Sequence, residues 1–186
     1  MHYEIGLGLE RMDDLLFSFR MGKNQVFGRF DIINLYFLEM SKYSRVYESA
    51  FSAGIEKRVD VVPEVQLVYG LDMGFEVSDR FSEYPEDMPI SSTMPTGSNI
   101  ITYTNTFTRS VFTNLVAGIL FFPAEKLKVR LDYIPRFYWS RYEKESGVLY
   151  PLDNNETERI KVSHVEKKYS QSSLPNYSVS IFYQIR

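Results

Sequence analysis

The segment EVQLVYGLDMGFEV, residues 64–77, alternates without a break between apolar residues and small or polar ones. Successive side chains of an extended strand point to opposite faces, so one face of this segment is entirely apolar. The other face carries carboxylates, an amide and glycines, with Val68 as its one apolar member. The pattern predicts a strand with one apolar face, and the function depends on which solvent that face meets.

The same two-residue period recurs along the chain, for example in YEIGLGLER at 3–11 and KLKVRLDY at 126–133. Helical periodicity is not convincing anywhere in the sequence. The third segment, FGRFDIINLYFLEM, is the least regular, and the facing of residues 26–39 stays open. We predict eight strands, at residues 2–11, 14–22, 26–39, 44–59, 63–79, 99–121, 126–142 and 174–186.

The connections between these strands fall into two sets. One set is tight: GKNQ at 22–25, DVVP at 60–63 and FPAEK at 122–126. The other set contains two long polar stretches, at 80–98 and 144–173. Consecutive antiparallel strands place alternate connections at opposite ends of a sheet. Both long stretches are therefore expected at one end, and both termini at the other end with the tight turns.

Composition excludes several functional classes. The net charge is −3 and the pI is about 5.5, which gives no case for nucleic-acid binding. The absence of cysteine excludes a disulfide framework and a thiolate metal site. No apolar run of about 18 residues is present, so no membrane-spanning helix is expected. The chain passes directly from Met1-His2 into a strand-like pattern, and an export signal is expected to have been removed.

An even number of antiparallel strands with short turns at one end and longer loops at the other is typical of bacterial outer-membrane barrels. In this pattern the sequence resembles the small eight-stranded barrels of the outer membrane protein A and X type. More narrowly, it resembles the outer membrane protein beta-barrel domains of Bacteroidetes. The segments that carry the resemblance are YGLDMGFEVSDRF at 69–81, AGILFFPAEKLKVRLDY at 117–133 and YSVSIFYQIR at 177–186.

The resemblance implies an all-β fold, a closed eight-stranded antiparallel up-and-down transmembrane barrel. It implies a single domain over residues 1–186 and a location in the outer membrane of a Gram-negative bacterium. Many members of the family end in an aromatic residue, whereas this chain ends in Ile185-Arg186.

The alternation is compatible with two orientations of a barrel wall. In a soluble lipocalin-like barrel the apolar face lines the interior and binds a lipid or a small apolar ligand. In a membrane barrel the same face contacts lipid. The polar face is rich in small residues such as Gly6, Gly8 and Gly118, and it carries charges of both signs. These features suit a cramped interior, and Tyr and Trp near the ends of the apolar face suit a membrane boundary. The lipid bilayer is therefore the first expected partner.

Charged residues of the polar face are then expected to point into the lumen and to form a structural ion-pair network. Eight strands leave an interior just wide enough for side chains to fill, so a narrow channel is an alternative that these charges disfavour. The residues assigned to the network are Glu10, Arg20, Glu48, Glu56, Asp72, Glu76, Arg130 and Arg136.

Pro135 interrupts the predicted strand at 126–142, because proline cannot donate a ladder hydrogen bond. Either a β-bulge or the exit of the strand from the membrane is expected there. A bulge would reverse the facing of the residues that follow it.

No catalytic residue, cofactor or metal site is expected. Neither His2 nor His164 has an evident catalytic partner, and DNNET at 153–157 lacks the spacing of a dedicated Ca²⁺ site. The expected function is non-enzymatic: adhesion, envelope integrity or docking to a protein partner through residues 80–98 and 144–173.

The predicted docking residues are apolar or aromatic side chains of the two long connections that lipid contact does not require. They are Tyr84, Met88, Leu149, Tyr150 and Tyr169. The basic pair Lys167-Lys168 beside Tyr169 is a candidate contact for lipopolysaccharide phosphate.

Overall fold

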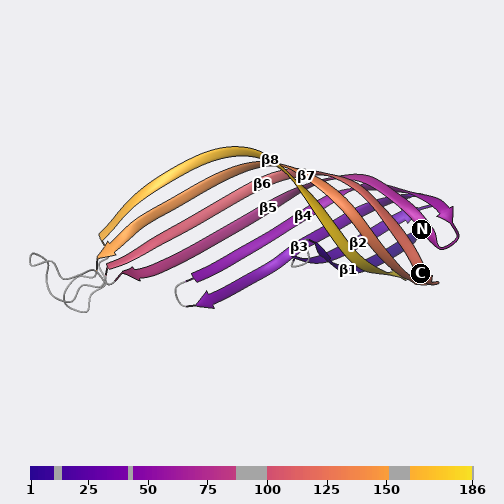
Figure 1. The fold of residues 1–186 in the computed structure, drawn as a ribbon, viewed down its shortest axis with the longest axis horizontal. Helices are drawn as coiled ribbons and strands as arrows, with labels where there is room; N and C mark the ends of the chain where they lie inside the picture. The colour runs from indigo at the N-terminus through magenta and orange to yellow at the C-terminus, as the bar shows by residue number, and fades with distance from the viewer. Residues whose placement is uncertain (11–13, 42–43, 87–99, 151–159, 186) are drawn as a thin grey trace, which may run out of the picture.

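The computed structural model describes residues 1–10, 14–41, 44–86, 100–150 and 160–185, and these form eight strands (Figure 1). Within the strands, the side chains of 34–41, 84–86, 100–101, 148–150 and 160–163 lie outside the description. The strands are β1 His2–Glu10, β2 Asp14–Lys23, β3 Val26–Ser41, β4 Ser44–Val62, β5 Val65–Glu86, β6 Ile100–Ala124, β7 Leu127–Tyr150 and β8 Ile160–Ile185. None of the described segments forms a helix long and apolar enough to cross a membrane.

Each strand pairs antiparallel with its neighbours in the sequence, and β1 pairs with β8 to close the barrel. The closing ladder runs from Tyr3 opposite Ile185 to Glu10 opposite Ser178. Both termini lie at the same end, called the terminal end below (Figure 1). The tight turn between β2 and β3 has Asn24 at a φ of 59°, a left-handed conformation that asparagine tolerates. The predicted closed antiparallel up-and-down barrel is confirmed.

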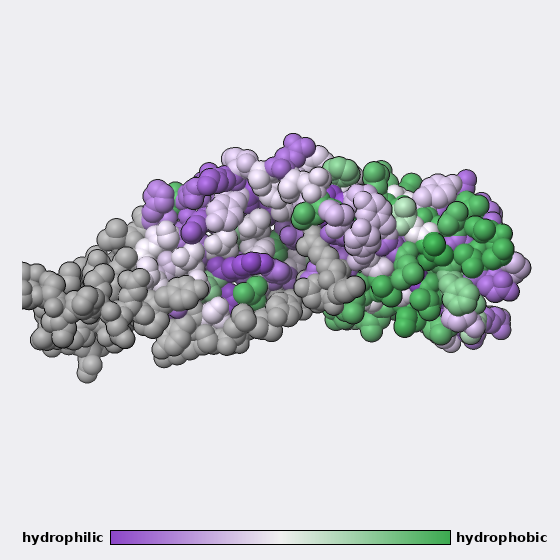
Figure 2. Space-filling view, viewed as in Figure 1, coloured by the Kyte–Doolittle hydropathy of each residue, from purple (hydrophilic) through white to green (hydrophobic). Residues whose placement is uncertain are grey.

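The alternation of side chains separates the two faces of the wall. In β5, Leu67, Tyr69 and Leu71 are exposed, whereas Val68 and Asp72 are buried. The same alternation holds around the barrel, and hydrophobic residues cover the outside near the terminal end (Figure 2). The apolar face therefore points outward, which is the reverse of a lipocalin-like barrel.

The strands differ greatly in length. The β1–β8 ladder stops at Glu10 and the β2–β3 ladder begins at Leu16, while β3 to β8 continue beyond them as a curved sheet (Figure 1). We call this part the extension. It comprises the portions of β3 to β8 beyond the pairs Glu10–Ser178 and Leu16–Ile33.

The predicted boundaries of the two long connections are wrong. Strands occupy residues 80–86, 144–150 and 160–173, leaving only 87–99 and 151–159 outside the described strands. Cross-strand pairs such as Glu143–Lys167 continue the β7–β8 ladder there. The sequence signal was weak because a sheet that is wet on both faces needs no apolar alternation.

The β3–β4 register shifts by one residue between Ile33 and Tyr36, within the segment of least regular sequence, whose facing was left open. At Pro135 the sequence left two alternatives, a bulge or the exit of the strand from the membrane, and the structure contains no bulge there. The β6–β7 ladder lacks the pairs at Ile134 and Pro135 but resumes in the same register, so Arg136 stays buried and Phe137 exposed. The missing donor interrupts the ladder without inserting a residue.

Candidate functional site

The lumen is filled by charged side chains in equal numbers. Among the described residues, six cationic and six acidic side chains are buried, so these twelve side chains together carry no net formal charge. The cations are Arg20, Arg29, Arg58, Lys128, Arg130 and Arg136, and the carboxylates are Glu4, Glu10, Asp31, Glu56, Asp72 and Asp132.

The part of this network nearest the terminal end is built around Glu4. The Glu4 carboxylate accepts hydrogen bonds from both terminal nitrogens of Arg58, at 2.8 and 2.7 Å, and is also ion-paired with Lys128. Arg58 lies 2.7 Å from Glu56, and its guanidinium carbon lies 3.7 Å from the ring centroid of Phe27. These contacts join β1, β4 and β7 across the lumen.

Glu56 connects this region to the middle of the network. It accepts a hydrogen bond of 2.6 Å from Arg130, whose Nε lies 2.7 Å from Asp132. The Nε of Arg20 lies 3.3 Å from the same oxygen, Oε2 of Glu56. Arg20 in turn donates to Asp31 at 2.7 Å.

Asp31, Asp72 and Glu10 complete the network toward the extension. Arg29 lies 2.6 Å from Asp31 and 3.3 Å from Asp72. Asn114 donates to Asp72 at 3.2 Å and accepts from Arg136 at 2.7 Å. Arg136 lies 2.7 Å from Glu10.

An apolar cluster of buried side chains also lies in the barrel. Its members are Leu16, Ile33, Ala50, Phe112 and Tyr138. The Arg136 guanidinium carbon lies 4.3 Å from the ring centroid of Phe112, so the cluster adjoins the ion-pair network. Salt bridges and apolar packing together fill the interior, as expected for eight strands.

Glycines make room for the largest lumen side chains. A Cβ built on Gly6 would lie 2.5 Å from the ring of Phe182, which is buried between Arg20 and Arg130. A Cβ on Gly118 would lie 1.9 Å from a carboxylate oxygen of Asp132. The glycines on the polar face therefore reflect close packing in the lumen.

Replacing Gly6 with valine is expected to destabilise the barrel by about 1–3 kcal/mol, because the new side chain overlaps the Phe182 ring. Urea-induced unfolding in detergent micelles measures the change. The double variant Gly6→Val/Phe182→Leu, which removes part of the ring volume, is the control and should recover part of the loss. Equal stability of Gly6→Val and the parent protein would contradict the close packing.

Six of the residues assigned from the sequence lie in the network: Glu10, Arg20, Glu56, Asp72, Arg130 and Arg136. The other two, Glu48 and Glu76, line a small cavity of about 50 Å³ together with Asp14, Ile33 and Arg136. Glu48 accepts a hydrogen bond of 3.1 Å from Ser78 and is ion-paired with Arg80, whose side chain is 62 % exposed. These two carboxylates thus lie at the end of the lumen toward the extension, where the side chains are more exposed to solvent.

Six buried charges lie outside the network assigned from the sequence: Glu4, Arg29, Asp31, Arg58, Lys128 and Asp132. Arg29 and Asp31 lie in the irregular third segment, where they share the inward face with Phe27 and Ile33. The large apolar residues on that face hid its polar character. Arg58 follows Glu56 by two residues, and this spacing was the signal that could have identified it.

The lumen has the chemistry of a structural network. Each of its six carboxylates lies within ion-pair distance of an arginine or lysine. Within the described ranges, no group of three or more His, Cys, Asp or Glu side chains is arranged to hold a metal ion.

Of the predicted docking residues, Tyr169 is the one whose backbone and side chain are both described. It lies on β8 and is 78 % exposed. Tyr84, Leu149 and Tyr150 lie in strands, but their side chains are outside the description, and Met88 lies outside the described residues. On the extension Lys168 and Glu166 form an ion pair of 2.5 Å. Their hydrogen bond and opposite charges raise the pKa of Lys168 and lower the pKa of Glu166.

No protein-family model matches this sequence, and no curated protein matches it. Among solved structures, one similar chain is described as "Crystal Structure of Pseudomonas aeruginosa OccK10 (OpdN)". The alignment covers 100 % of this chain and 98 % of that chain, with 6 % identity and a TM-score of 0.12. A likeness at this level carries no argument about fold or function. The fold assignment thus rests on the strand pairing of this chain, and the likeness to the A and X type stays a prediction.

Proposed function

We propose that this protein is an integral barrel of the bacterial outer membrane, with a structural lumen and an extension that serves as its working surface. One observation carries the proposal: charged side chains are buried inside the barrel while large apolar side chains cover its outside. In lipid, a closed barrel satisfies all its backbone hydrogen bonds, and its outer face is apolar. In water, such an exterior would favour aggregation.

The extent of the apolar exterior supports this proposal. On β6 the outward-facing residues run from Phe121 to Val111, with Thr113 as the one polar side chain, before Arg109 follows. On β7 they run from Leu127 to Trp139 before Arg141 follows. We call this surface the belt. Tyr3, Tyr69 and Tyr183 lie toward its terminal end and Trp139 toward the extension, as in interfacial aromatic girdles.

Reconstitution tests the membrane and lumen parts of the proposal. Refolded into phospholipid vesicles, the protein is expected to resist carbonate extraction and to change its gel mobility on boiling. In planar bilayers it should show no large, steady conductance, because ion pairs span the lumen at Glu4–Arg58 and Glu56–Arg130. A stable monomer in detergent-free buffer would overturn the membrane assignment, and a steady large conductance would overturn the filled lumen.

The extension is the proposed surface for adhesion, envelope integrity or docking, because lipid contact and lumen filling occupy the rest of the barrel. Both β-hairpins, β5–β6 and β7–β8, reach into it, and Tyr169 is exposed on it. Polar segments carried on a rigid scaffold are where binding commonly occurs.

This role can be tested by shortening the two hairpins while keeping the register of the remaining strand pairs. Replacing residues 84–102 and 144–166 by Asn-Gly turns would leave Glu83–Tyr103 and Glu143–Lys167 as the last pairs. We expect vesicle insertion and heat resistance to be retained and the adhesion of cells that display the protein to be lost. A variant shortened in one hairpin alone is the control. Failure of the doubly shortened barrel to assemble would show that the extension belongs to the fold rather than to the function.

A further inference from the structure

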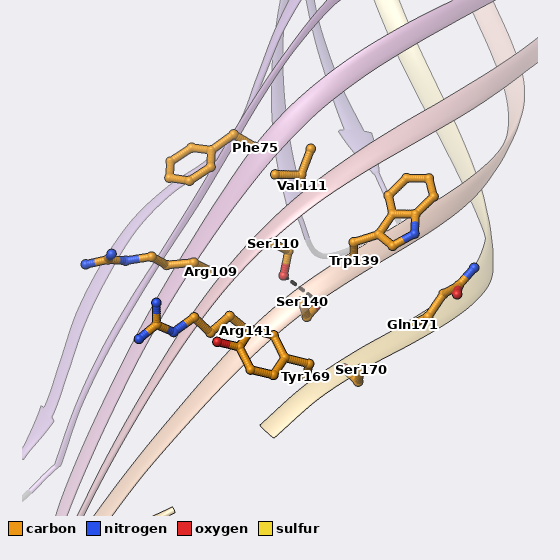
Figure 3. A pocket seen from close by; sticks show the side chains of 10 residues that line it. All are labelled: Phe75, Arg109, Ser110, Val111, Trp139, Ser140, Arg141, Tyr169, Ser170 and Gln171. Carbon is orange, nitrogen blue, oxygen red and sulfur yellow. Dashed lines mark hydrogen bonds between the residues drawn. The ribbon is translucent and has the colours of Figure 1, made fainter. Parts of the chain in front are cut away.

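A groove of about 610 Å³ crosses the outer wall of the barrel from β5 to β8 (Figure 3). Its outward-facing lining combines aromatic, aliphatic and cationic side chains from four consecutive strands. These are Phe75, Arg109, Val111, Trp139, Arg141 and Tyr169, and the polar Gln171 lies opposite Trp139.

The lining residues are ordered in rows by the strand register. Arg109 lies directly opposite Arg141, and Arg141 lies opposite Tyr169. Two residues nearer the terminal end, Val111 lies opposite Trp139. The two arginines thus occupy the first row beyond the belt, where a lipid headgroup would lie.

Placing two arginines directly opposite each other is unfavourable unless another charge compensates them, because like charges in this position destabilise a sheet. Arg141 is ion-paired with Glu143, but Glu143 lies one row farther from the belt and is also 3.9 Å from Lys167. Asp79 lies in that farther row as well, opposite Phe107.

Arg109 has no ion pair with any carboxylate in the described part of the chain, and its guanidinium carbon lies 4.6 Å from the ring centroid of Phe107. The row nearest the belt therefore contains two guanidinium groups and no carboxylate. In Figure 3 both guanidinium groups point to the same side, away from Trp139, and Arg141 lies beside the Tyr169 ring.

We propose that this groove binds an outer-leaflet lipid with a phosphate-bearing headgroup. The phosphate contacts Arg109 and Arg141, and an acyl chain lies on Val111, Phe75 and Trp139. Guanidinium groups match the geometry of phosphate oxygens, and tryptophan favours the membrane boundary. The site rests on the proposed membrane location, and it moves the expected lipid contact from Lys167-Lys168 to the arginine row.

Trp139 is the only tryptophan of the chain, so its fluorescence reports directly on the groove. The protein is refolded into phosphatidylcholine vesicles that contain a minor fraction of either dibrominated phosphatidic acid or dibrominated phosphatidylcholine. Bromine quenches tryptophan on contact. An arginine near an anionic lipid contributes a preference of roughly fivefold, so quenching should indicate enrichment of phosphatidic acid by about tenfold or more over its bulk fraction.

The variant Arg109→Gln/Arg141→Gln is expected to reduce this enrichment to the bulk value. Lys57→Gln is the matched control, because Lys57 is an exposed cation on the outer face at the opposite end of the belt. It should leave the enrichment unchanged. Inorganic phosphate lacks an acyl chain and should not compete, and full competition by it would overturn the lipid assignment.

The outcomes separate the two proposals. If neither brominated lipid quenches Trp139, the barrel is not in the bilayer and the proposed function fails. If both lipids quench in proportion to their bulk fractions, the barrel is in the bilayer but the headgroup site does not exist. The same conclusion follows if the double variant keeps the preference.

Discussion

Replacing Arg130 with alanine is expected to lower the free energy of unfolding by about 3–5 kcal/mol. Arg130 is 0 % exposed and holds two carboxylates, with contacts of 2.6 Å to Glu56 and 2.7 Å to Asp132. Removing the guanidinium leaves these negative charges together in the lumen with one cation fewer. The loss of stability arises mainly from the buried carboxylates that lose their cation, rather than from the hydrogen bonds that are removed.

Urea-induced unfolding in phospholipid vesicles measures this effect. Arg80→Ala is the matched control, because Arg80 also forms an ion pair with a glutamate but its side chain is 62 % exposed. We expect a change below about 1 kcal/mol for this exposed pair. The double variant Arg130→Met/Asp132→Asn should be more stable than Arg130→Ala, since it removes one stranded charge and keeps the volume. Similar losses at Arg130 and Arg80 would show that the lumen is hydrated and that its ion pairs are not structural.

The second large effect is expected on the outside of the barrel. Leu115 is 48 % exposed and lies near the middle of the apolar run on β6. Leu115→Arg should destabilise the barrel in vesicles by about 2–4 kcal/mol, because the charge is placed near the bilayer midplane. Leu127→Arg, at the start of β7, should cost only about 0–1 kcal/mol, since that position is close to the interface.

The comparison between these two positions tests the membrane depth of the belt. In a protein surrounded by water, an arginine would be equally tolerated at both sites. Equal and small effects in vesicles would therefore contradict the proposed orientation of the barrel in lipid.

Much of the barrel could be predicted from the sequence, because one structural period governs both of its faces. The alternation at 64–77 sets the facing of β5, and the glycines at 6, 8 and 118 indicate the crowded side. A strand with one face in lipid and the other in a narrow lumen must alternate strictly. This is why the number of strands and their facing agree with the structure over most of the barrel.

Part of the extension was not predicted as sheet, because the constraint that produces alternation is absent there. Residues 167–173 of β8 are exposed on both faces, and all but Tyr169 are polar. Their strand assignment depends on the ladder with β7. Tertiary pairing of this kind overrides a weak local signal.

Which charged side chains pair with each other in the lumen could not be predicted from the sequence either. Glu4 and Arg58 are separated by 54 positions and meet across the barrel rather than along a ladder. Such contacts depend on the tilt and stagger of the strands, which a one-dimensional pattern does not specify. The sequence therefore identified half of the twelve buried charges but not their pairing.

The placement of the ion pairs constrains the order in which this barrel can assemble. The two carboxylates of β1, Glu4 and Glu10, find their cations on β4 and β7: Arg58, Lys128 and Arg136. In the proposed bilayer, an unpaired charge would be costly. A hairpin of β1 and β2 alone would carry Glu4 and Glu10 without these cations, so we expect insertion to be coupled to the closure of the barrel by the first and last strands. That closure joins the ends of the chain, and contacts between segments distant in sequence form slowly.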